Sequence, residues 1–188
     1  KAIEAQRAKR LTVNPISMKK ALSHIILEES VFNKIGPAAN SGKSMFLYGP
    51  PGNGKTTIAE AIGRMILKDD MYIPYAVEVD GQIIKVYDEI NHNVVTDPIE
   101  RVNTGSLSGR KLDARWIRIQ RPAIMVGGEL TLDGLELKYD TINKYYEAPL
   151  QMKANGGMFL IDDFGRQQVR PRDLLNRWIV PMEKNIDF

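Results

Sequence analysis

The stretch Gly49-Pro50-Pro51-Gly52-Asn53-Gly54-Lys55-Thr56-Thr57 decides how this sequence is interpreted. It fits the pattern G-x-x-x-x-G-K-[ST], in which glycines let the backbone turn its N–H groups inward around phosphate oxygens. In that pattern Lys55 reaches the β- and γ-phosphates of a nucleotide, and the Thr56 hydroxyl ligates Mg²⁺. We therefore predict a phosphate-binding loop for ATP and Mg²⁺, with nine candidate binding residues: Gly49, Pro50, Pro51, Gly52, Asn53, Gly54, Lys55, Thr56 and Thr57.

The residues on both sides of the loop support this prediction. Residues 44–48 form a short apolar run, which is typical of a buried strand. Residues 55–68 carry apolar side chains at helical spacing, so we predict a helix whose positive end points at the bound anion. The apolar positions of that helix are Ile58, Ala61, Ile62, Met65 and Ile66.

A second stretch supplies the acid that such a loop needs for Mg²⁺. Residues 158–161 are apolar and are followed by Asp162 and Asp163. In open α/β sheets, ligands bind beyond the carboxyl ends of the strands, which is where this acid pair would lie. We predict that Asp162 contacts Mg²⁺ and that Asp163 orients or deprotonates the attacking water.

These two stretches resemble the AAA+ ATPases. The resemblance is carried by GPPGNGKTT at 49–57 and GGMFLIDDFG at 156–165, and the approach at 153–163 is similar to the enhancer-binding activator and MoxR-like branches. It implies an α/β fold, a P-loop NTPase parallel sheet flanked by helices, and ATP hydrolysis that drives conformational work on a partner macromolecule. It also implies a homo-oligomeric ring, often a hexamer. One departure is Asp163, because family members usually have Glu there.

The resemblance divides the chain into a basic extension at 1–16 and an AAA+ α/β domain at 17–188. The stretch from Lys55 to Asp162 is longer than the family implies, so we predict a β-hairpin-rich insertion at about 72–138. Asp80-Gly81 predicts a two-residue turn between strands 75–79 and 82–86. A second hairpin is predicted over 130–137, and the resemblance suggests that it contacts the partner.

Other elements follow from periodicity and from breakers. We predict a helix over 18–35, capped by Ser17 and ended by Gly36-Pro37. Further helices are predicted over 140–153 and over 172–179, the latter ending before Pro181. Strands are predicted at 116–120 and 123–126, and a loop at 88–113.

The resemblance places the sensor-1 strand, the usual arginine finger and the helical lid beyond Phe188. The four arginines after the acid pair are open to two interpretations, pairing across a subunit interface or solvation at the surface. They are Arg166, Arg170, Arg172 and Arg177.

Composition excludes several other classes. The chain has no cysteine, so disulfides and Cys-based metal sites are ruled out. No apolar stretch is long enough to span a bilayer, and we expect a cytoplasmic protein.

The net charge is +3, with basic runs near the start and at 110–121. Nucleic-acid binding by these runs is weighed against a solvated surface, and the solvated surface is favoured. His24 and His92 are interpreted as structural or surface residues.

The sequence therefore predicts a Mg²⁺·ATP-binding ATPase with Lys55 and Asp163 as its catalytic residues. Two alternatives stay open. A nucleotide-binding switch or scaffold with little turnover is favoured by Asp163 in place of Glu. A small-molecule kinase would use the same loop but transfer the phosphate to an acceptor other than water.

Overall fold

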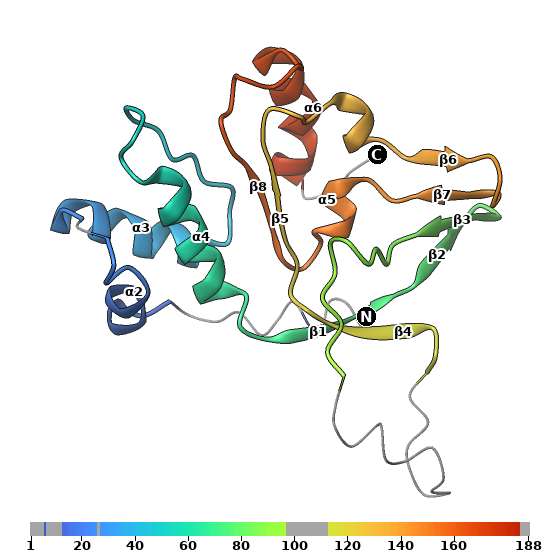
Figure 1. The fold of residues 1–188 in the computed structure, drawn as a ribbon, viewed down its shortest axis with the longest axis horizontal. Helices are drawn as coiled ribbons and strands as arrows, with labels where there is room; N and C mark the ends of the chain where they lie inside the picture. The colour runs from blue at the N-terminus through green and yellow to red at the C-terminus, as the bar shows by residue number, and fades with distance from the viewer. Residues whose placement is uncertain (1–5, 7–12, 26, 97–112, 185–188) are drawn as a thin grey trace, which may run out of the picture. The chain divides into compact units, whose positions relative to one another are not determined.

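A computed structural model describes residues 6, 13–25, 27–96 and 113–184 (Figure 1). The fold is mixed α/β, as the sequence predicted, and it contains both parallel and antiparallel strand pairs. It forms two compact units. Unit 1 comprises residues 1–8, 67–124 and 133–159, and unit 2 comprises residues 9–66, 125–132 and 160–188. The phosphate loop and the acid pair both belong to unit 2.

Unit 2 begins with helix α2, Pro15–Ala21. Asn14 caps it, because its side chain accepts a hydrogen bond from the Ser17 N–H at 2.7 Å while the Ser17 hydroxyl accepts from the Asn14 N–H at 3.2 Å. Pro15 stands at the first helical position, where the missing N–H costs nothing. The predicted helix over 18–35 with a Ser17 cap is therefore wrong, and Ser17 is the third helical residue.

Helix α3, Glu29–Ser41, runs through the Gly36-Pro37 pair that was predicted to end it. It ends instead at Gly42, whose φ of 62° is in the left-handed region that glycine adopts without strain. Ile35 of this helix is buried in the core of unit 2. After the proline, the partly buried Ala39 also packs against this core. We attribute the continued helix to this packing on both sides of Pro37, which outweighs the one backbone hydrogen bond that the proline lacks.

Helix α4, Lys55–Ile66, follows the phosphate loop and confirms the predicted helix, two residues shorter than expected. Its apolar face packs with α2 and α3 into one core. The segment 44–48 before the loop is not a strand, which corrects the prediction. Leu47 packs against the core, but Phe46 and Tyr48 are exposed, so only one side of the segment is covered. The core residues are Val13, Met18, Leu22, Ile35, Ile58, Ala61, Ile62 and Met65.

Unit 1 contains two small sheets. Strand β1, Asp70–Pro74, pairs antiparallel with β4, Trp116–Gln120, and Met71, Ile73 and Ile119 are buried there. The second sheet has the order β2-β3-β7-β6, and its β3–β7 pair is parallel. Its strands are β2 Ala76–Val79, β3 Gln82–Lys85, β6 Lys138–Asp140 and β7 Tyr145–Glu147.

The first predicted hairpin is confirmed. Val77 pairs with Ile84, as the two-residue turn predicted. Both turn residues have positive φ, 51° at Asp80 and 77° at Gly81. A two-residue turn with this backbone conformation matches the right-handed twist of the two antiparallel strands that it joins.

The second predicted hairpin, over 130–137, is wrong. Its Asp133-Gly134 lies inside a short 3-10 helix, η1, Leu132–Leu135. The predicted helix over 140–153 is also wrong for most of its length, because β6 and β7 form a hairpin there. The Asp140 carboxylate accepts N–H bonds from Ile142 and Asn143, which fixes a turn in place of a helix. Only α5, Leu150–Lys153, is helical.

Strands β5, Ala123–Val126, and β8, Met158–Ile161, form a two-stranded sheet. The Met158 N–H donates to the Pro122 carbonyl at 2.9 Å and the Asp162 N–H donates to the Val126 carbonyl at 2.8 Å. From the first bond to the second, the donor and the acceptor both move four residues towards the C-terminus, so the two strands are parallel. Gly157 allows the close approach at the start of β8, because a Cβ there would collide with the Pro122 backbone.

Helix α6, Pro171–Lys184, corrects the last predicted helix. It starts with Pro171 at its first position and continues through Pro181, where a stop was expected. Leu174 is buried on its inner face. Most of the predicted basic extension at 1–16 lies outside the described residues, as do residues 97–112 of the predicted loop at 88–113 and the last four residues.

Candidate functional site

The phosphate loop connects the segment 44–48 to helix α4. Gly52 and Gly54 have φ of 82° and 68°, conformations that side-chain-bearing residues rarely adopt. A Cβ built on either glycine would meet no atom within 4 Å, so the loop is open on that side. The Ile58 N–H donates to the Gly54 carbonyl at 2.9 Å, which begins the helix directly after the loop. The helix therefore directs its unpaired N–H groups towards the loop.

Lys55 lies across the start of the loop. Its ammonium donates to the Pro50 carbonyl at 2.8 Å and to the Gly49 carbonyl at 3.2 Å. Both partners are neutral backbone oxygens, so no carboxylate compensates the lysine charge in these bonds. A phosphate oxygen would be a stronger partner, since charge-assisted hydrogen bonds are about twice as strong as those to neutral groups.

Thr56 joins the phosphate loop to the acid pair. Its hydroxyl donates to Asp162 Oδ2 at 2.9 Å, across 106 positions in the sequence. Helix α4 supplies the threonine from its first turn, and the carboxyl end of β8 supplies the aspartate. The structure thus brings together the two stretches that the sequence analysis selected separately.

Asp163 differs from Asp162 in its surroundings. It is exposed, its φ is 50°, and its Oδ2 lies 3.6 Å from the Arg166 guanidinium. Its backbone N–H donates to Asp162 Oδ1 at 2.9 Å, so both oxygens of the Asp162 carboxylate have a protein partner. The Asp163 carboxylate faces solvent and is available to a water molecule.

The donor set fits Mg²⁺ and a nucleotide. Magnesium prefers oxygen ligands from one or two protein groups plus phosphate oxygens, and the Thr56 hydroxyl with the Asp162 carboxylate supplies such a pair. Within the described residues, no group of three or more His, Cys, Asp or Glu side chains is placed to hold a metal alone. A metal at this site would therefore depend on phosphate oxygens and water for its remaining ligands.

One further carboxylate lies at the same end of the β5–β8 sheet. Glu129 follows β5, and its Oε1 accepts the Gly127 N–H at 2.8 Å. That backbone hydrogen bond holds the pKa of Glu129 below its usual range. The sequence analysis did not select Glu129, because a lone acid after a glycine pair carries no motif.

Gln167 was also missed, and it contacts the acid pair directly. Its amide donates to the carbonyls of Asp162 and Asp163 at 2.8 and 3.1 Å, and its oxygen accepts the Gly165 N–H at 2.7 Å. It is only 9% exposed. Glutamine is mostly found at the surface, so burial is the signal, and burial is visible only in the fold.

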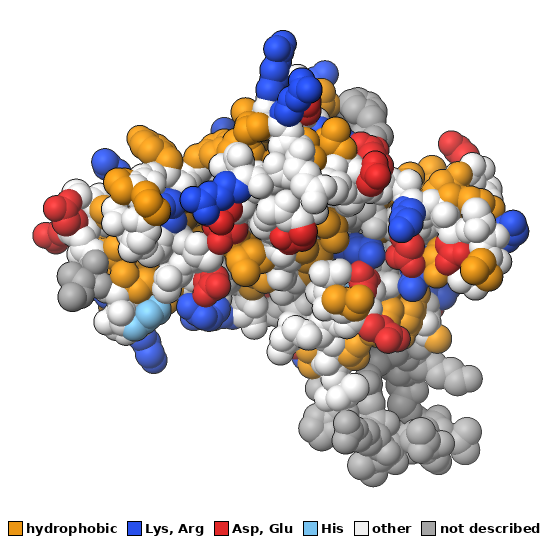
Figure 2. Space-filling model, turned by 45° about the horizontal axis from the view of Figure 1, so that its top comes forward, with side chains coloured by type: hydrophobic (Ala, Val, Ile, Leu, Met, Phe, Trp, Pro, Cys, Tyr) orange, Lys and Arg blue, Asp and Glu red, His pale blue; other side chains and the backbone are white. Residues whose placement is uncertain are grey.

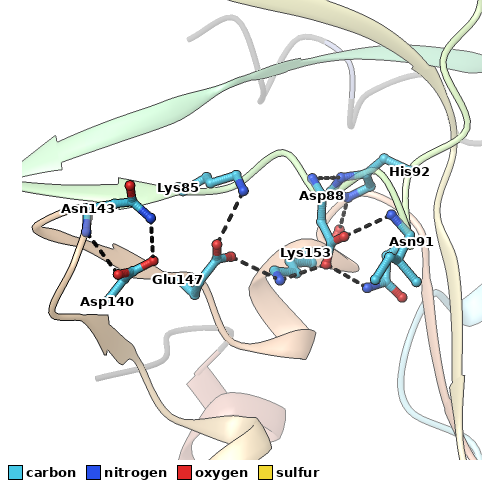
Figure 3. A network of polar contacts seen from close by, with 9 residues as sticks. Lys85, Asp88, Asn91, His92, Asp140, Asn143, Glu147 and Lys153 are labelled. Carbon is cyan, nitrogen blue, oxygen red and sulfur yellow. Dashed lines mark hydrogen bonds and ion pairs between the residues drawn. The ribbon is translucent and has the colours of Figure 1, made fainter.

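A second group of charged side chains lies in unit 1 (Figure 3). Lys153 lies 2.7 Å from Asp88 and 3.3 Å from Glu147, and Glu147 also pairs with Lys85 at 3.3 Å. Burial alone would raise the pKa of Asp88, but hydrogen bonds from Lys153, Asn91 and the Ile90 N–H outweigh it and lower the pKa to about 2. These charges compensate one another, so we assign them a structural role.

His92 belongs to this second group and is buried. Its Nδ1 accepts the Asp88 N–H at 3.0 Å, which leaves Nε2 to donate to the Lys153 carbonyl at 2.9 Å. Both ring nitrogens are thus bonded to the backbone, which favours the structural one of the two roles, structural or surface, that were left open for this histidine.

Among the residues that the structure describes, the charged side chains give no independent support for nucleic-acid binding. On the face drawn in Figure 2, Lys and Arg side chains are interspersed with Asp and Glu side chains. In the basic run at 110–121, Arg115 pairs with Asp113 and Arg118 pairs with Asp70, while 110–112 lie outside the described residues. Among the helices that the structure describes, none combines the length and the apolar character needed to cross a membrane.

Comparisons with known proteins match part of the chain. Residues 45–101 match the family model for the ATPase family associated with various cellular activities (AAA). A 48-residue stretch is 46% identical to a vesicle-fusing ATPase of Dictyostelium discoideum. That match covers 26% of this chain and only 6% of the relative. Neither match distinguishes the enhancer-binding or MoxR-like branch. The segment that carries the phosphate loop is therefore similar to AAA ATPases in sequence.

Proposed function

We propose that this chain binds Mg²⁺·ATP and hydrolyses it to ADP and phosphate. The observation that carries the proposal is the hydrogen bond between Thr56 and Asp162, which joins the phosphate loop to the end of β8. The similarity of residues 45–101 to AAA ATPases supports the same activity. The site residues are those of the loop, 49–57, together with Asp162 and Asp163.

Each residue has a distinct part in the proposed mechanism. The loop N–H groups and the Lys55 ammonium hold the phosphate charge, which increases on the transferred group in the transition state. Thr56 and Asp162 hold Mg²⁺, whose chemistry is to neutralise charge on the phosphate oxygens. Asp163 accepts a hydrogen bond from the attacking water and orients it in line with the bond that breaks.

The wider function is proposed from the family likeness. Turnover would drive conformational change in a partner macromolecule, within a homo-oligomeric ring and in the cytoplasm. The likeness of 153–163 to the enhancer-binding and MoxR-like branches stays a prediction that rests on those residues alone. The insertion predicted at about 72–138 has no assigned partner.

The test is steady-state phosphate release from the full chain with Mg²⁺·ATP, at several protein concentrations. Lys55→Ala should reduce release by about 100- to 1,000-fold, because one charge-stabilising donor is lost. Lys43→Ala is the matched control, since Lys43 is an exposed lysine just before the loop. Equal release from the wild type and Lys55→Ala would contradict the assignment. Release that rises more than linearly with protein concentration would support a shared site in an oligomer.

One observation favours a second candidate, an ATP-binding switch with little turnover. Asp163 is a methylene shorter than the glutamate usual in the family, and its carboxylate already faces Arg166. The variant Asp163→Glu discriminates the two functions. Much faster release in this variant would favour the switch for the natural chain, and unchanged release would count against it. Phosphate transfer to a small acceptor in place of water would favour a kinase.

A further inference from the structure

We infer that Gln167 is the positioning residue that sets where the Asp163 carboxylate points during hydrolysis. This inference rests on the proposed function and adds a residue to its machinery. The hydrogen bonds of the Gln167 side chain go to backbone groups. They join it to the carbonyls of Asp162 and Asp163 and to the Gly165 N–H.

The turn after β8 has a backbone that needs support. Asp163 and Gly165 both have positive φ, 50° and 99°. For a residue with a side chain, the left-handed conformation costs roughly 1 kcal/mol or more. The Arg166 N–H donates to the Asp163 carbonyl at 2.9 Å and the Asp163 N–H donates to Asp162 Oδ1 at 2.9 Å, but neither bond reaches Gly165. Further contacts are needed to keep the whole turn in one conformation.

Gln167 supplies those contacts. Its Nε2 donates to the carbonyls of Asp162 and Asp163, and its Oε1 accepts the Gly165 N–H at 2.7 Å. The orientation of the amide is fixed by these partners, because a flipped amide would face oxygen with oxygen and N–H with N–H. This one side chain therefore binds three consecutive peptide groups of the turn that carries Asp163.

Asp162 does not depend on Gln167 to the same extent. Its carboxylate is held by the Thr56 hydroxyl on one oxygen and by the Asp163 N–H on the other. Within the part of the chain that the structure describes, the Asp163 carboxylate pairs with Arg166, whose side chain is 75% exposed, and such a pair is a weak constraint in water. Loss of Gln167 should thus disturb the orientation of water more than the binding of Mg²⁺·ATP.

The key variant is Gln167→Met, which keeps the side-chain length and burial but removes all three hydrogen bonds. We expect kcat to fall by about 10- to 100-fold, since small displacements of a positioned group have effects of this size. The dissociation constant for Mg²⁺·ATP should change by less than about threefold, because the loop and Thr56 are untouched. Gln168→Met is the matched control, because Gln168 is the exposed neighbour of the same type.

A second experiment separates positioning from general weakening of the fold. In an Asp163→Ala background, Gln167→Met should cause no further loss of kcat, because the group that it positions is already gone. Gln167→Glu serves as the second variant if the methionine variant fails to fold. It keeps the acceptor for Gly165 but cannot donate to the two carbonyls at neutral pH, so it should also lower kcat.

Three results would overturn the inference. The first is a kcat of Gln167→Met equal to that of the wild type, and the second is an equal fold-loss of ATP affinity and of kcat in that variant. The third is that Gln167→Met lowers kcat by the same factor in the wild-type background and in the Asp163→Ala background. Wild-type chain that binds ATP but releases no phosphate would instead overturn the proposed hydrolysis, and the role of Gln167 in turnover with it. Normal wild-type turnover with normal turnover in Gln167→Met would overturn only the role of Gln167.

Discussion

The candidate site of unit 2 and the Asp88–Lys153 cluster of unit 1 differ in how their charged side chains are paired. In the cluster, Lys153 is 10% exposed and lies between two carboxylates. At the candidate site, Lys55 bonds only neutral carbonyls and Asp163 faces solvent. Charges that compensate one another internally stabilise a fold, whereas charges left with weak partners can bind a ligand. The difference is the reason that we assign function to one group and not to the other.

Removing Lys153 should have the largest effect on stability. Lys153→Met leaves Asp88 and Glu147 without their shared cation, and breaking a buried pair in this way costs about 3 kcal/mol. The free energy of unfolding, measured in urea at pH 7, would show this loss. Lys138→Met, an exposed lysine on β6, should leave the unfolding free energy nearly unchanged. A negligible loss in Lys153→Met would mean that the cluster is not a structural element.

Thr56→Val tests the other side of the comparison. We expect phosphate release to fall by about 100-fold, equivalent to about 2.8 kcal/mol in transition-state stabilisation, because the hydroxyl that bonds Asp162 and would ligate Mg²⁺ is lost. The measurement is turnover over a range of Mg²⁺ concentrations. Thr141→Val is the control, because Thr141 is an exposed threonine outside the candidate site. Wild-type turnover in Thr56→Val would show that the bond to Asp162 has no functional part.

The dependence of stability on pH should come from the cluster. The pKa of Asp88 is lowered from 3.8 to about 2 in the folded chain, so its ionised form is favoured there. Its stabilisation is present above the unfolded value and is lost as the pH falls through 3.8 towards 2. The loss should be about 1 to 2 kcal/mol, discounted for solvent screening.

Unfolding free energies of wild type and Asp88→Asn at pH 5 and pH 3 would measure this contribution. The wild type should lose more stability between these two pH values than the variant does. The same slope in both proteins would remove Asp88 as the source of the pH dependence.

The smallest effect is expected at the exposed pair of Asp113 and Arg115. Hydrogen bonds from Arg115 lower the pKa of Asp113 to about 2, the same value as for Asp88. The Arg115 side chain is 84% exposed, so water screens the pair. Arg115→Ala should leave the melting temperature unchanged within error, as a thermal melt would show. A clear decrease in the melting temperature would mean that an ion pair that lowers the pKa of a carboxylate stabilises the fold even when the pair is exposed.

The sequence analysis was most accurate where structure is set by residues close together in the chain. Helix α4 and the β2–β3 hairpin were predicted within a residue or two, because helical spacing and the Asp80-Gly81 turn are local signals. The predictions failed at Pro37 and Pro181, which lie inside helices, and at 44–48, which is not a strand. In each case the outcome depends on what packs against the segment, and a breaker or an apolar run does not contain that information.

The same division holds for the candidate site. The sequence by itself determined the phosphate loop, with its glycines, Lys55 and Thr56, because the order of these residues is the motif. It also selected Asp162 and Asp163 by their position after an apolar run. Only the tertiary structure decided that Thr56 bonds Asp162, that Gln167 is buried beneath the turn at Asp163, and that Lys153 bonds Asp88 from 65 positions away. Hydrogen bonds and burial are set by distances in space, and separation along the chain does not encode those distances until the core has packed.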